Sequence, residues 1–259
     1  MSASRALIRT EDLSVGHGRK LLVSNINMDL PAGSLTALLG INGIGKSTLL
    51  RTLAGLHLPL KGKVLVGGEN VHALSAMERA RRIAVVLTGR PRTGMLDVET
   101  LVALGRQPWT DRWGRTTAAD HKAVEQALEQ SGAMHLRHRQ VATCSDGEVQ
   151  KVLIARALAQ ATPVLLLDEP TAFLDLPNRA DIVRVLRSIA HGSNKAVFFS
   201  THDLQLSLDL SDRVVLMRNG EGLWQGTPGE AMNSGELGRA FSGSGVSIDP
   251  LTGTHRFLP

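Results

Sequence analysis

The most constraining feature of the sequence is a glycine-rich segment between a predicted strand and a predicted helix. Residues 34–39 form an apolar run typical of a buried strand, and residues 46–54 show a helical pattern that stops before Gly55. Between them, GINGIGKS at 40–47 matches the spacing G-x-x-x-x-G-K-[ST]. In this context we expect the glycines to let the main chain form a nest of N–H donors.

Such a nest binds phosphate groups. The helix N-terminus adds roughly half a positive charge, and Lys46 places a full charge beside the β- and γ-phosphates. Ser47 supplies a hydroxyl ligand for Mg²⁺. We therefore predict a nucleoside triphosphate site made by Gly40, Ile41, Asn42, Gly43, Ile44, Gly45, Lys46, Ser47 and Thr48.

Two adjacent carboxylates follow a second apolar strand, residues 164–167. Asp168 suits Mg²⁺, directly or through water, because this cation prefers oxygen ligands. Glu169 is then free to orient or deprotonate an attacking water. Taken alone, the pair is equally typical of two solvated acids at a strand end, but beside the phosphate loop it predicts hydrolysis of the triphosphate.

A third segment begins a helical run. Ser145 and Glu148 have the spacing of a capping box, which by itself is the simpler explanation. Gly147 lies within the first turn and opens its main-chain amides, so the same helix end could also bind a second phosphate-bearing surface. Both interpretations stay open at this point.

The rest of the chain predicts an α/β fold. Apolar runs typical of strands also occur at about 63–66, 83–87, 196–200 and 213–217. Helical patterns occur at 117–130, where Thr117 and Asp120 have the spacing of a capping box, and at 178–190, where Ile182, Val185, Leu186 and Ile189 share one face. Their alternation favours a parallel core. The first 30 residues look like antiparallel strands on either side of a turn at 16–18, laid beside that core.

We predict one domain, 1–259, with an inserted helical part. The core and its β subdomain comprise residues 1–88 and 163–259, and residues 89–162, mainly helical and containing Ser145, form a helical subdomain.

Composition limits the possible environment and partners. No apolar run approaches the ~20 residues that span a bilayer, and a single cysteine excludes an internal disulfide framework. We therefore expect a cytosolic chain that does not cross a membrane. The 29 basic and 24 acidic residues leave a charge of +5, but three Trp, five Phe and no Tyr offer few stacking platforms, so we expect no nucleic-acid partner.

The order of these motifs, followed by Leu174-Asp175 and by Ser200-Thr201-His202-Asp203, resembles the ATP-binding subunit of an ABC transporter from about Leu7 to Phe241. The resemblance implies a P-loop NTPase core of RecA-like type that binds ATP and Mg²⁺. It also implies a head-to-tail homodimer, in which each ATP lies between the Lys46 loop of one copy and the signature segment of the other, with Ser145, Gly147 and Glu148. By the same resemblance, His202 lies near the γ-phosphate and Asp175 links the two sites.

The sequence departs from the usual pattern of this family in several places. His17 stands where an aromatic residue normally stacks on adenine, and the signature reads CSDGE instead of LSGGQ. Thr88 stands where a glutamine that touches Mg²⁺ is expected, so we expect an indirect metal contact through a water held by the Thr88 hydroxyl. Cys144 is either a plain replacement of leucine or a thiol with a lowered pKa at the helix start.

The segment LVALGRQPW at 101–109, together with the signature, is similar to importers of the iron-siderophore, haem and cobalamin type. This resemblance implies a polytopic membrane permease, indirectly a substrate-binding protein, and a peripheral location at the cytoplasmic face of the inner membrane. The loop 90–95 lies where the family docks the permease, and a solvated basic loop explains this segment equally well. Two alternatives are a soluble ABC-type ATPase of Fe–S assembly or translation, and a weakly hydrolysing regulatory nucleotide-binding module.

Overall fold

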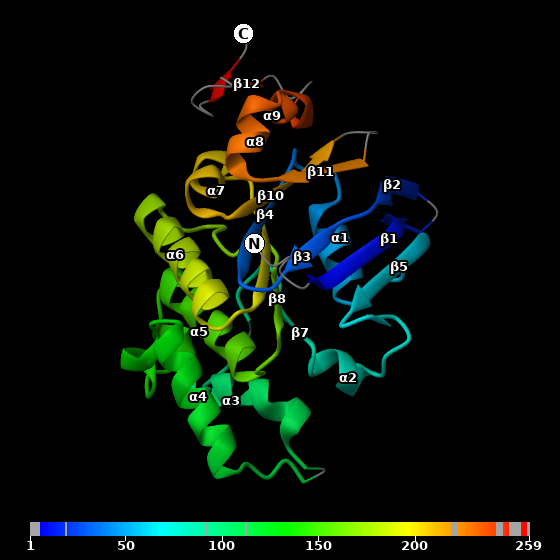
Figure 1. Cartoon of the computed structure of the whole chain (residues 1–259). Coiled ribbons are helices and arrows are strands. Elements are labelled where there is room, and N and C mark those ends of the chain that lie inside the picture. The colour runs from blue at the N-terminus through cyan, green and yellow to red at the C-terminus, as the bar shows by residue number, and fades with distance from the viewer. Residues whose placement is uncertain are drawn as a thin grey trace.

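The computed structural model describes residues 6–18, 20–91, 93–111, 113–218, 222–241, 246–248 and 255–257. Its centre is a six-stranded sheet in the order β11-β10-β4-β9-β8-β7 (Figure 1). These strands are β4 (Ser34–Leu39), β7 (Ile83–Val86), β8 (Val164–Leu167), β9 (Ala196–Ser200), β10 (Arg213–Arg218) and β11 (Gly222–Gly226). All neighbours pair in parallel except β10 and β11, which confirms the predicted parallel core.

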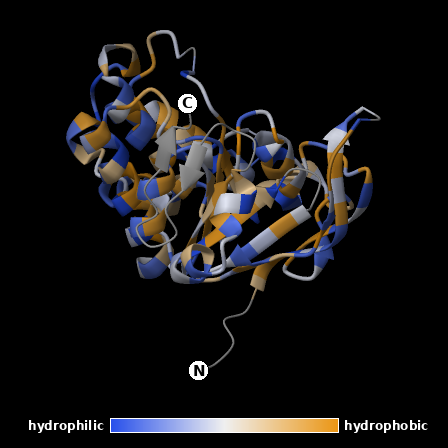
Figure 2. Cartoon of the chain, turned by 90° about the horizontal axis from the view of Figure 1, so that it is seen from above, coloured by the Kyte–Doolittle hydropathy of each residue, from blue (hydrophilic) through white to orange (hydrophobic). Residues whose placement is uncertain are grey.

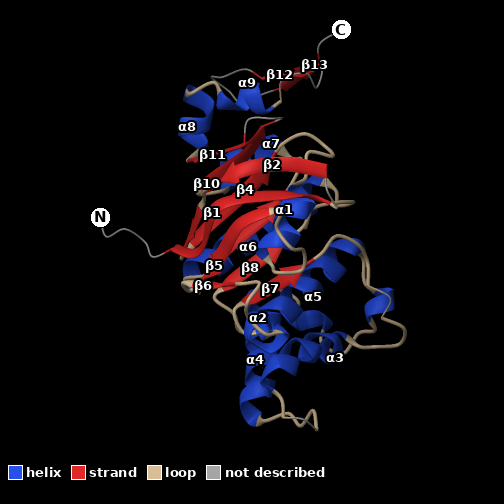
Figure 3. Ribbon diagram, turned by 90° about the vertical axis from the view of Figure 1, so that its right-hand side faces the viewer, coloured by secondary structure: helices blue, strands red, loops and turns tan. Residues whose placement is uncertain are grey.

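A second, antiparallel sheet lies beside the first and has β1 at its centre (Figure 3). Its strands are β1 (Ala6–His17), β2 (Lys20–Ile26), β3 (Asp29–Pro31), β5 (Lys61–Val66) and β6 (Glu69–Asn70). The prediction that 63–66 belongs to the parallel core is wrong, since Val66 pairs antiparallel with Ile8. On its other side β5 pairs with β6, to which the chain turns back directly through Gly67 and Gly68, so both neighbours of β5 are antiparallel to it.

Both faces of the central sheet are covered. Successive strand residues point to opposite faces, and Leu166 and Phe198 belong to a core cluster with helix α1 (Lys46–Leu53) and the antiparallel sheet. Leu165 and Leu167 belong to the other cluster, which is built from the helices of the opposite side. The run VLLL is therefore apolar at every position because both of its faces are buried.

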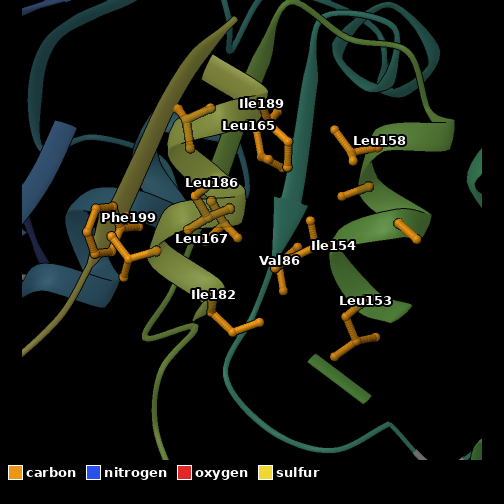
Figure 4. Close-up of a cluster of buried hydrophobic side chains, with 14 of the residues drawn as sticks. Val86, Leu153, Ile154, Leu158, Leu165, Leu167, Ile182, Leu186, Ile189 and Phe199 are labelled. Carbon is orange, nitrogen blue, oxygen red and sulfur yellow. The ribbon is translucent and has the colours of Figure 1, made fainter. Parts of the chain in front are cut away.

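Helices α5 (Asp146–Ala159) and α6 (Leu176–Gly192) pack on that second face (Figure 4). Their inward side chains share helical spacing: Leu153, Ile154 and Leu158 on α5, and Ile182, Leu186 and Ile189 on α6. The predicted helix at 178–190 and its buried stripe are thus confirmed.

Between β7 and β8 the named elements in the described part of the chain are all helical. They are α3 (Val98–Ala103), the 3₁₀ helix η1 (Leu104–Trp109), α4 (Ala118–Gln130), the short 3₁₀ turns η2 (Met134–Leu136) and η3 (Val141–Thr143), and α5. Figures 1 and 3 place α3 and α4 at one end of the molecule, beyond the edge strand β7. The division of the chain into two subdomains stays a prediction.

A buried ion pair fixes this helical end. Arg106 Nε donates to Asp120 Oδ1 at 2.8 Å, and Arg106 Nη1 donates to the carbonyl oxygen of Ala159 at 2.8 Å, so η1, α4 and α5 meet at one guanidinium. Asp120 also closes the predicted capping box with Thr117 at the start of α4. Hydrogen bonds from Thr117 and then from Arg106 lower the pKa of Asp120 to about 2.

The remaining elements are α2 (Ala76–Ala80), α7 (Leu204–Leu210), α8 (Pro228–Asn233), α9 (Glu236–Ala240), β12 (Val246–Ile248) and β13 (His255–Phe257). In Figure 2 hydrophobic residues concentrate in the strands at the centre, and the surrounding helices mix hydrophobic with hydrophilic residues. Among the residues placed by the structure, no helix has both the length and the apolar character needed to span a bilayer.

Candidate active site

The loop between β4 and α1 requires glycine at specific positions. The φ values are 153° at Gly40, 78° at Gly43 and 114° at Gly45. Residues other than glycine rarely adopt this region of backbone conformation. Gly45 precedes α1 in a left-handed conformation and provides no side-chain cap. The first amides of α1 therefore have no side chain from the N-cap bonded to them, which leaves them available to an anion.

Lys46 lies under this loop and is 6% exposed. Its Nζ donates to the carbonyl oxygens of Gly40 at 2.9 Å and Ile41 at 3.2 Å. Burial lowers the pKa of Lys46, against the opposing attraction of Glu169 and Asp168. A phosphate group beside Nζ would favour the charged form and compensate for the burial.

Three oxygen-bearing side chains meet at the carboxyl ends of β8 and β9. Ser47 Oγ donates to Asp168 Oδ1 at 2.9 Å, and Ser200 Oγ donates to the same oxygen at 2.8 Å. Asp168 is 2% exposed. A hydroxyl and a carboxylate at hydrogen-bond distance are the ligand types that Mg²⁺ prefers, so Ser47 and Asp168 fit this cation.

Glu169 occupies a strained turn at the end of β8. Its φ is 47°, which is uncommon for a residue other than glycine, and its main-chain N donates to Ser200 Oγ at 2.9 Å. This turn brings both carboxylates to the site, as predicted, because Asp168 contacts Ser47 while Glu169 lines the cavity beside Lys46. His202 Nδ1 lies 3.7 Å from Glu169 Oε2.

A cavity of about 450 Å³ lies over the loop and unites most of the predicted nucleotide residues. Its predicted lining residues are His17, Asn42, Gly43, Gly45, Lys46, Ser47, Thr48 and Glu169. The His17 ring meets the His57 ring edge to face, with centroids 5.6 Å apart. Ile44 is 8% exposed in the core next to α1, so its side chain packs away from the cavity and its main chain alone remains available to a ligand.

Sequence reasoning missed two kinds of site residue. Lys20 and Leu22 on β2 also line the cavity, and the signal for Lys20 was a basic residue directly after the predicted turn at 16–18. Ser200 was quoted only as part of a motif, yet it contacts both acids. Its position at the carboxyl end of a strand adjacent to β8 is the signal that could have identified it.

The second group of predicted residues lies at the starts of α5 and α6. The capping box is confirmed, since Ser145 Oγ accepts from Glu148 N and Glu148 Oε2 accepts from Ser145 N. Asp175 caps α6 by accepting from Asn178 N at 3.0 Å. A Cβ at Gly147 would lie 3.3 Å from the Asn178 side chain, so the two helix starts are adjacent. The residues that line the 450 Å³ cavity do not include this second group.

The hydroxyl of Thr88 connects this residue to the site around Asp168. Thr88 Oγ1 donates to the carbonyl oxygen of Asp168 at 2.8 Å, so it binds the main chain of the metal-ligand candidate. The role of Thr88 in holding a water for the metal stays a prediction.

Cys144 packs as an apolar residue just before Ser145. It is 4% exposed, and burial raises the pKa of its thiol. The alternative of a lowered pKa is therefore wrong, because desolvation outweighs the attraction of the nearby arginines.

Comparisons with known proteins agree with this geometry. Residues 23–172 match the family model described as ABC transporter. The chain is 34% identical over 260 residues to the ferric enterobactin transport ATP-binding protein FepC of Escherichia coli, covering 100% of this chain and 96% of that protein. It is 38% identical to the cobalamin import ATP-binding protein BtuD of Halobacterium salinarum, covering 92% of this chain and 60% of that protein. The solved structure of cbiO1 from Clostridium perfringens, part of the ABC transporter complex cbiONQ, superposes with a TM-score of 0.77 at 27% identity, covering 91% and 94% of the two chains.

Proposed function

This chain belongs to the ABC transporter family and is an ATP-binding ATPase, and on that premise we propose that it powers import of an iron chelate, haem or cobalamin through a membrane permease. The observation that carries the proposal is the joining of Ser47, Asp168 and Ser200 beneath the Lys46 loop, with Glu169 beside them. The relatives FepC and BtuD, whose names state ferric enterobactin and cobalamin transport, support the substrate class.

ATP is held by the loop and the start of α1. The amides of residues 40–48 bind the phosphates, and Lys46 adds a compact positive charge next to them. Ser47 and Asp168 would hold Mg²⁺, which would neutralise charge on the phosphate oxygens. His17, which also lines the cavity, offers a small aromatic face to the base.

Glu169 acts as the general base. Its carboxylate lines the cavity next to Lys46 and accepts the proton of the water that attacks the γ-phosphate. Ser200 holds the Glu169 main chain in its strained turn, so the carboxylate is positioned before substrate arrives. His202, 3.7 Å from that carboxylate, is assigned to the γ-phosphate side of the site.

Two copies of the chain form the complete site. Ser145, Gly147, Glu148 and Asp175 are all predicted nucleotide or interface residues, but they lie at the starts of α5 and α6, outside the cavity over Lys46. A head-to-tail homodimer would place this surface of one copy against the phosphates in the other. Phe173 and Leu176, 85% and 68% exposed, flank Asp175 and provide apolar area for that contact.

The permease docks on a groove of about 420 Å³ between the end of β7 and α5. Its lining combines an exposed leucine, Leu87, with Arg90 and Arg156. Part of the predicted docking loop, Arg92, lies outside the described residues. In this arrangement the chain is peripheral at the cytoplasmic face of the membrane and meets the substrate-binding protein only through the permease.

Steady-state ATPase assays over a range of chain concentrations test the dimer-dependent mechanism. We expect the rate per chain to rise with concentration, and Glu169→Gln to lower kcat by about 10²- to 10⁴-fold while nucleotide still binds. A rate per chain independent of concentration and unaffected by Ser145→Ala would contradict the dimer. Negligible turnover by the wild-type chain would favour the regulatory module, and full activity without any membrane partner in co-purification would favour the soluble ATPase.

A further inference from the structure

The first turn of α5 contains two acidic residues, and an arginine pairs with each of them. Arg90 Nη1 lies 2.9 Å from Asp146 Oδ1, and Arg139 Nη1 lies 3.0 Å from Glu148 Oε1. The two arginines come from different segments, one from the loop after β7 and one from the turn before η3. The helix start therefore has two carboxylates and two matched cations.

Each arginine also binds the main chain that leads into Ser145. Arg90 Nη2 donates to the carbonyl oxygen of Cys144 at 2.8 Å, and Arg139 Nη2 donates to that of Thr143 at 2.8 Å. In each guanidinium group, Nη1 thus binds a carboxylate and Nη2 binds a main-chain carbonyl oxygen. The repeated arrangement fixes the position of Ser145 relative to two neighbouring segments.

The two acids differ in what else they do. Glu148 Oε2 accepts from the main-chain N of Ser145 and closes the capping box. Asp146 lies between the two predicted phosphate contacts, Ser145 and Gly147, and its side chain is 60% exposed. An exposed ion pair stabilises a fold by only about 0–1 kcal/mol, so stability does not account for the Arg90–Asp146 pair.

We propose that Arg90 is a positioning residue that neutralises Asp146, so that the start of α5 can receive the triphosphate bound by a second copy of this chain. This inference rests on the proposed function and deepens it. An unpaired carboxylate between Ser145 and Gly147 would repel the negative charges of a triphosphate. The guanidinium of Arg90 compensates the charge of Asp146 and so weakens this repulsion.

Arg90 is also joined to the chain's own site. Two residues before it, Thr88 donates to the carbonyl oxygen of Asp168. A cavity of about 110 Å³ is lined by Thr88, Arg90, Asp146 and Glu169 together. The segment 88–90 therefore connects the metal end of one site with the surface offered to the other.

ATP-driven dimerisation in a Glu169→Gln background tests the proposal, because hydrolysis is then stopped and the ATP concentration for half-maximal dimer can be measured by analytical ultracentrifugation. We expect Arg90→Met to raise that concentration by at least about tenfold. Arg90→Met/Asp146→Asn should return it to within about threefold of the parent, since the repelling charge is gone. Arg90→Lys should be intermediate, and added salt should shrink the Arg90→Met defect because the repulsion is screened.

The matched control is Arg9→Met, which removes an equally exposed pair, Arg9 Nε to Asp29 Oδ1 at 2.9 Å, on β1 and β3. It should leave dimerisation unchanged. The inference is overturned if Arg90→Met behaves as Arg9→Met does, or if the double variant is as defective as the single one at every salt concentration. If the parent itself shows no ATP-driven dimer, the proposed function fails instead. Thermal unfolding of each variant verifies that it is folded.

Discussion

At the scale of single residues, Ser200 joins the two acids of the site. Its hydroxyl donates to Asp168 Oδ1 at 2.8 Å and accepts from Glu169 N at 2.9 Å, and the residue is fully buried. Ser200→Ala leaves both groups without this partner, which costs about 1–3 kcal/mol. We expect kcat for ATP to fall about tenfold, since that cost corresponds to roughly one decade of rate or more.

Nucleotide affinity should change much less in Ser200→Ala, because the loop amides and Lys46 are untouched. Steady-state ATPase and nucleotide-binding titrations measure the two effects separately. Ser234→Ala, which removes a long hydrogen bond of 3.5 Å at the end of α8, is the control. Equal losses of affinity and of kcat would show that Ser200 acts on binding instead of positioning Glu169.

Thr88 is a second residue whose contact gives a direct prediction. Thr88→Val keeps the shape of the side chain but removes the hydroxyl that binds the Asp168 carbonyl oxygen. We expect about a five- to tenfold lower ATPase rate, in line with about 1 kcal/mol for one hydrogen bond. Thr88→Ser should retain the rate. Indistinguishable rates for the Val and Ser variants would exclude a role for the hydroxyl, at the metal or at Asp168.

Individual site residues were predictable where a local pattern fixes their surroundings. The phosphate loop and the Asp168-Glu169 pair were found because a strand end places the following residues at one edge of the sheet. Arg90 was missed as a residue of the Ser145 segment because its partner is distant in sequence. Arg90 pairs with Asp146 across 56 positions, a contact that no short window can reveal.

At the scale of elements, α4 depends on the Arg106–Asp120 pair. Asp120 is 4% exposed, and its pKa is lowered from 3.8 to about 2. The charged carboxylate therefore stabilises the fold above the unfolded pKa, and this stabilisation is lost as pH falls from about 4 to about 2. The shift corresponds to about 2 kcal/mol of unfolding free energy at neutral pH.

Asp120→Asn should lower the unfolding free energy by at least about 2 kcal/mol at pH 7, because it also leaves Arg106 without its anion. Urea unfolding followed by circular dichroism measures this loss. The difference in unfolding free energy between this variant and the wild-type chain should become smaller below pH 4. Asp29→Asn, at an exposed ion pair of nearly equal length, is the control and should cost under about 1 kcal/mol. A difference in unfolding free energy that does not change with pH would show that the loss does not come from the charged carboxylate of Asp120.

The positions of several helices were predictable from the periodicity of apolar residues and from capping residues in the sequence. The Thr117–Asp120 and Ser145–Glu148 spacings marked the starts of α4 and α5, and the Ile182 stripe marked the buried face of α6. Strand β5 was found but assigned to the wrong sheet. A short apolar run of three residues, Val64 to Val66, fits either sheet, and the choice is made by pairing with β1, more than 50 positions away in sequence.

At the scale of the whole molecule, the two groups of site residues come from different parts of the fold, and the cavity over Lys46 contains none of Ser145, Gly147, Glu148 and Asp175. The phosphate loop follows β4 at the centre of the main sheet, whereas the Ser145 segment follows the helices beyond β7 (Figure 1). Sequence order alone suggested that the groups cooperate but gave no distance between them. The proposed dimer resolves this separation, because one copy presents what the other lacks.

The same view of the molecule gives a prediction for the permease contact. Leu87 is 41% exposed at the end of β7 and lines the groove of about 420 Å³ next to α5. An aspartate there would place a charge where an apolar segment of the permease must bury, and burying an unpaired charge is costly. We expect Leu87→Asp to reduce co-purification with the membrane subunit by at least about tenfold, equivalent to about 1.4 kcal/mol of binding free energy.

ATP-driven dimerisation should survive in Leu87→Asp, because Leu87 is not among the residues lining the cavity over Lys46. Leu58→Asp, at a leucine that is 77% exposed before β5, introduces the same charge on another surface and should retain both properties. Co-purification at equal yield for the wild-type and Leu87→Asp chains would move the permease contact away from this groove. Loss of dimerisation together with co-purification would mean that the groove and the dimer surface are one continuous site.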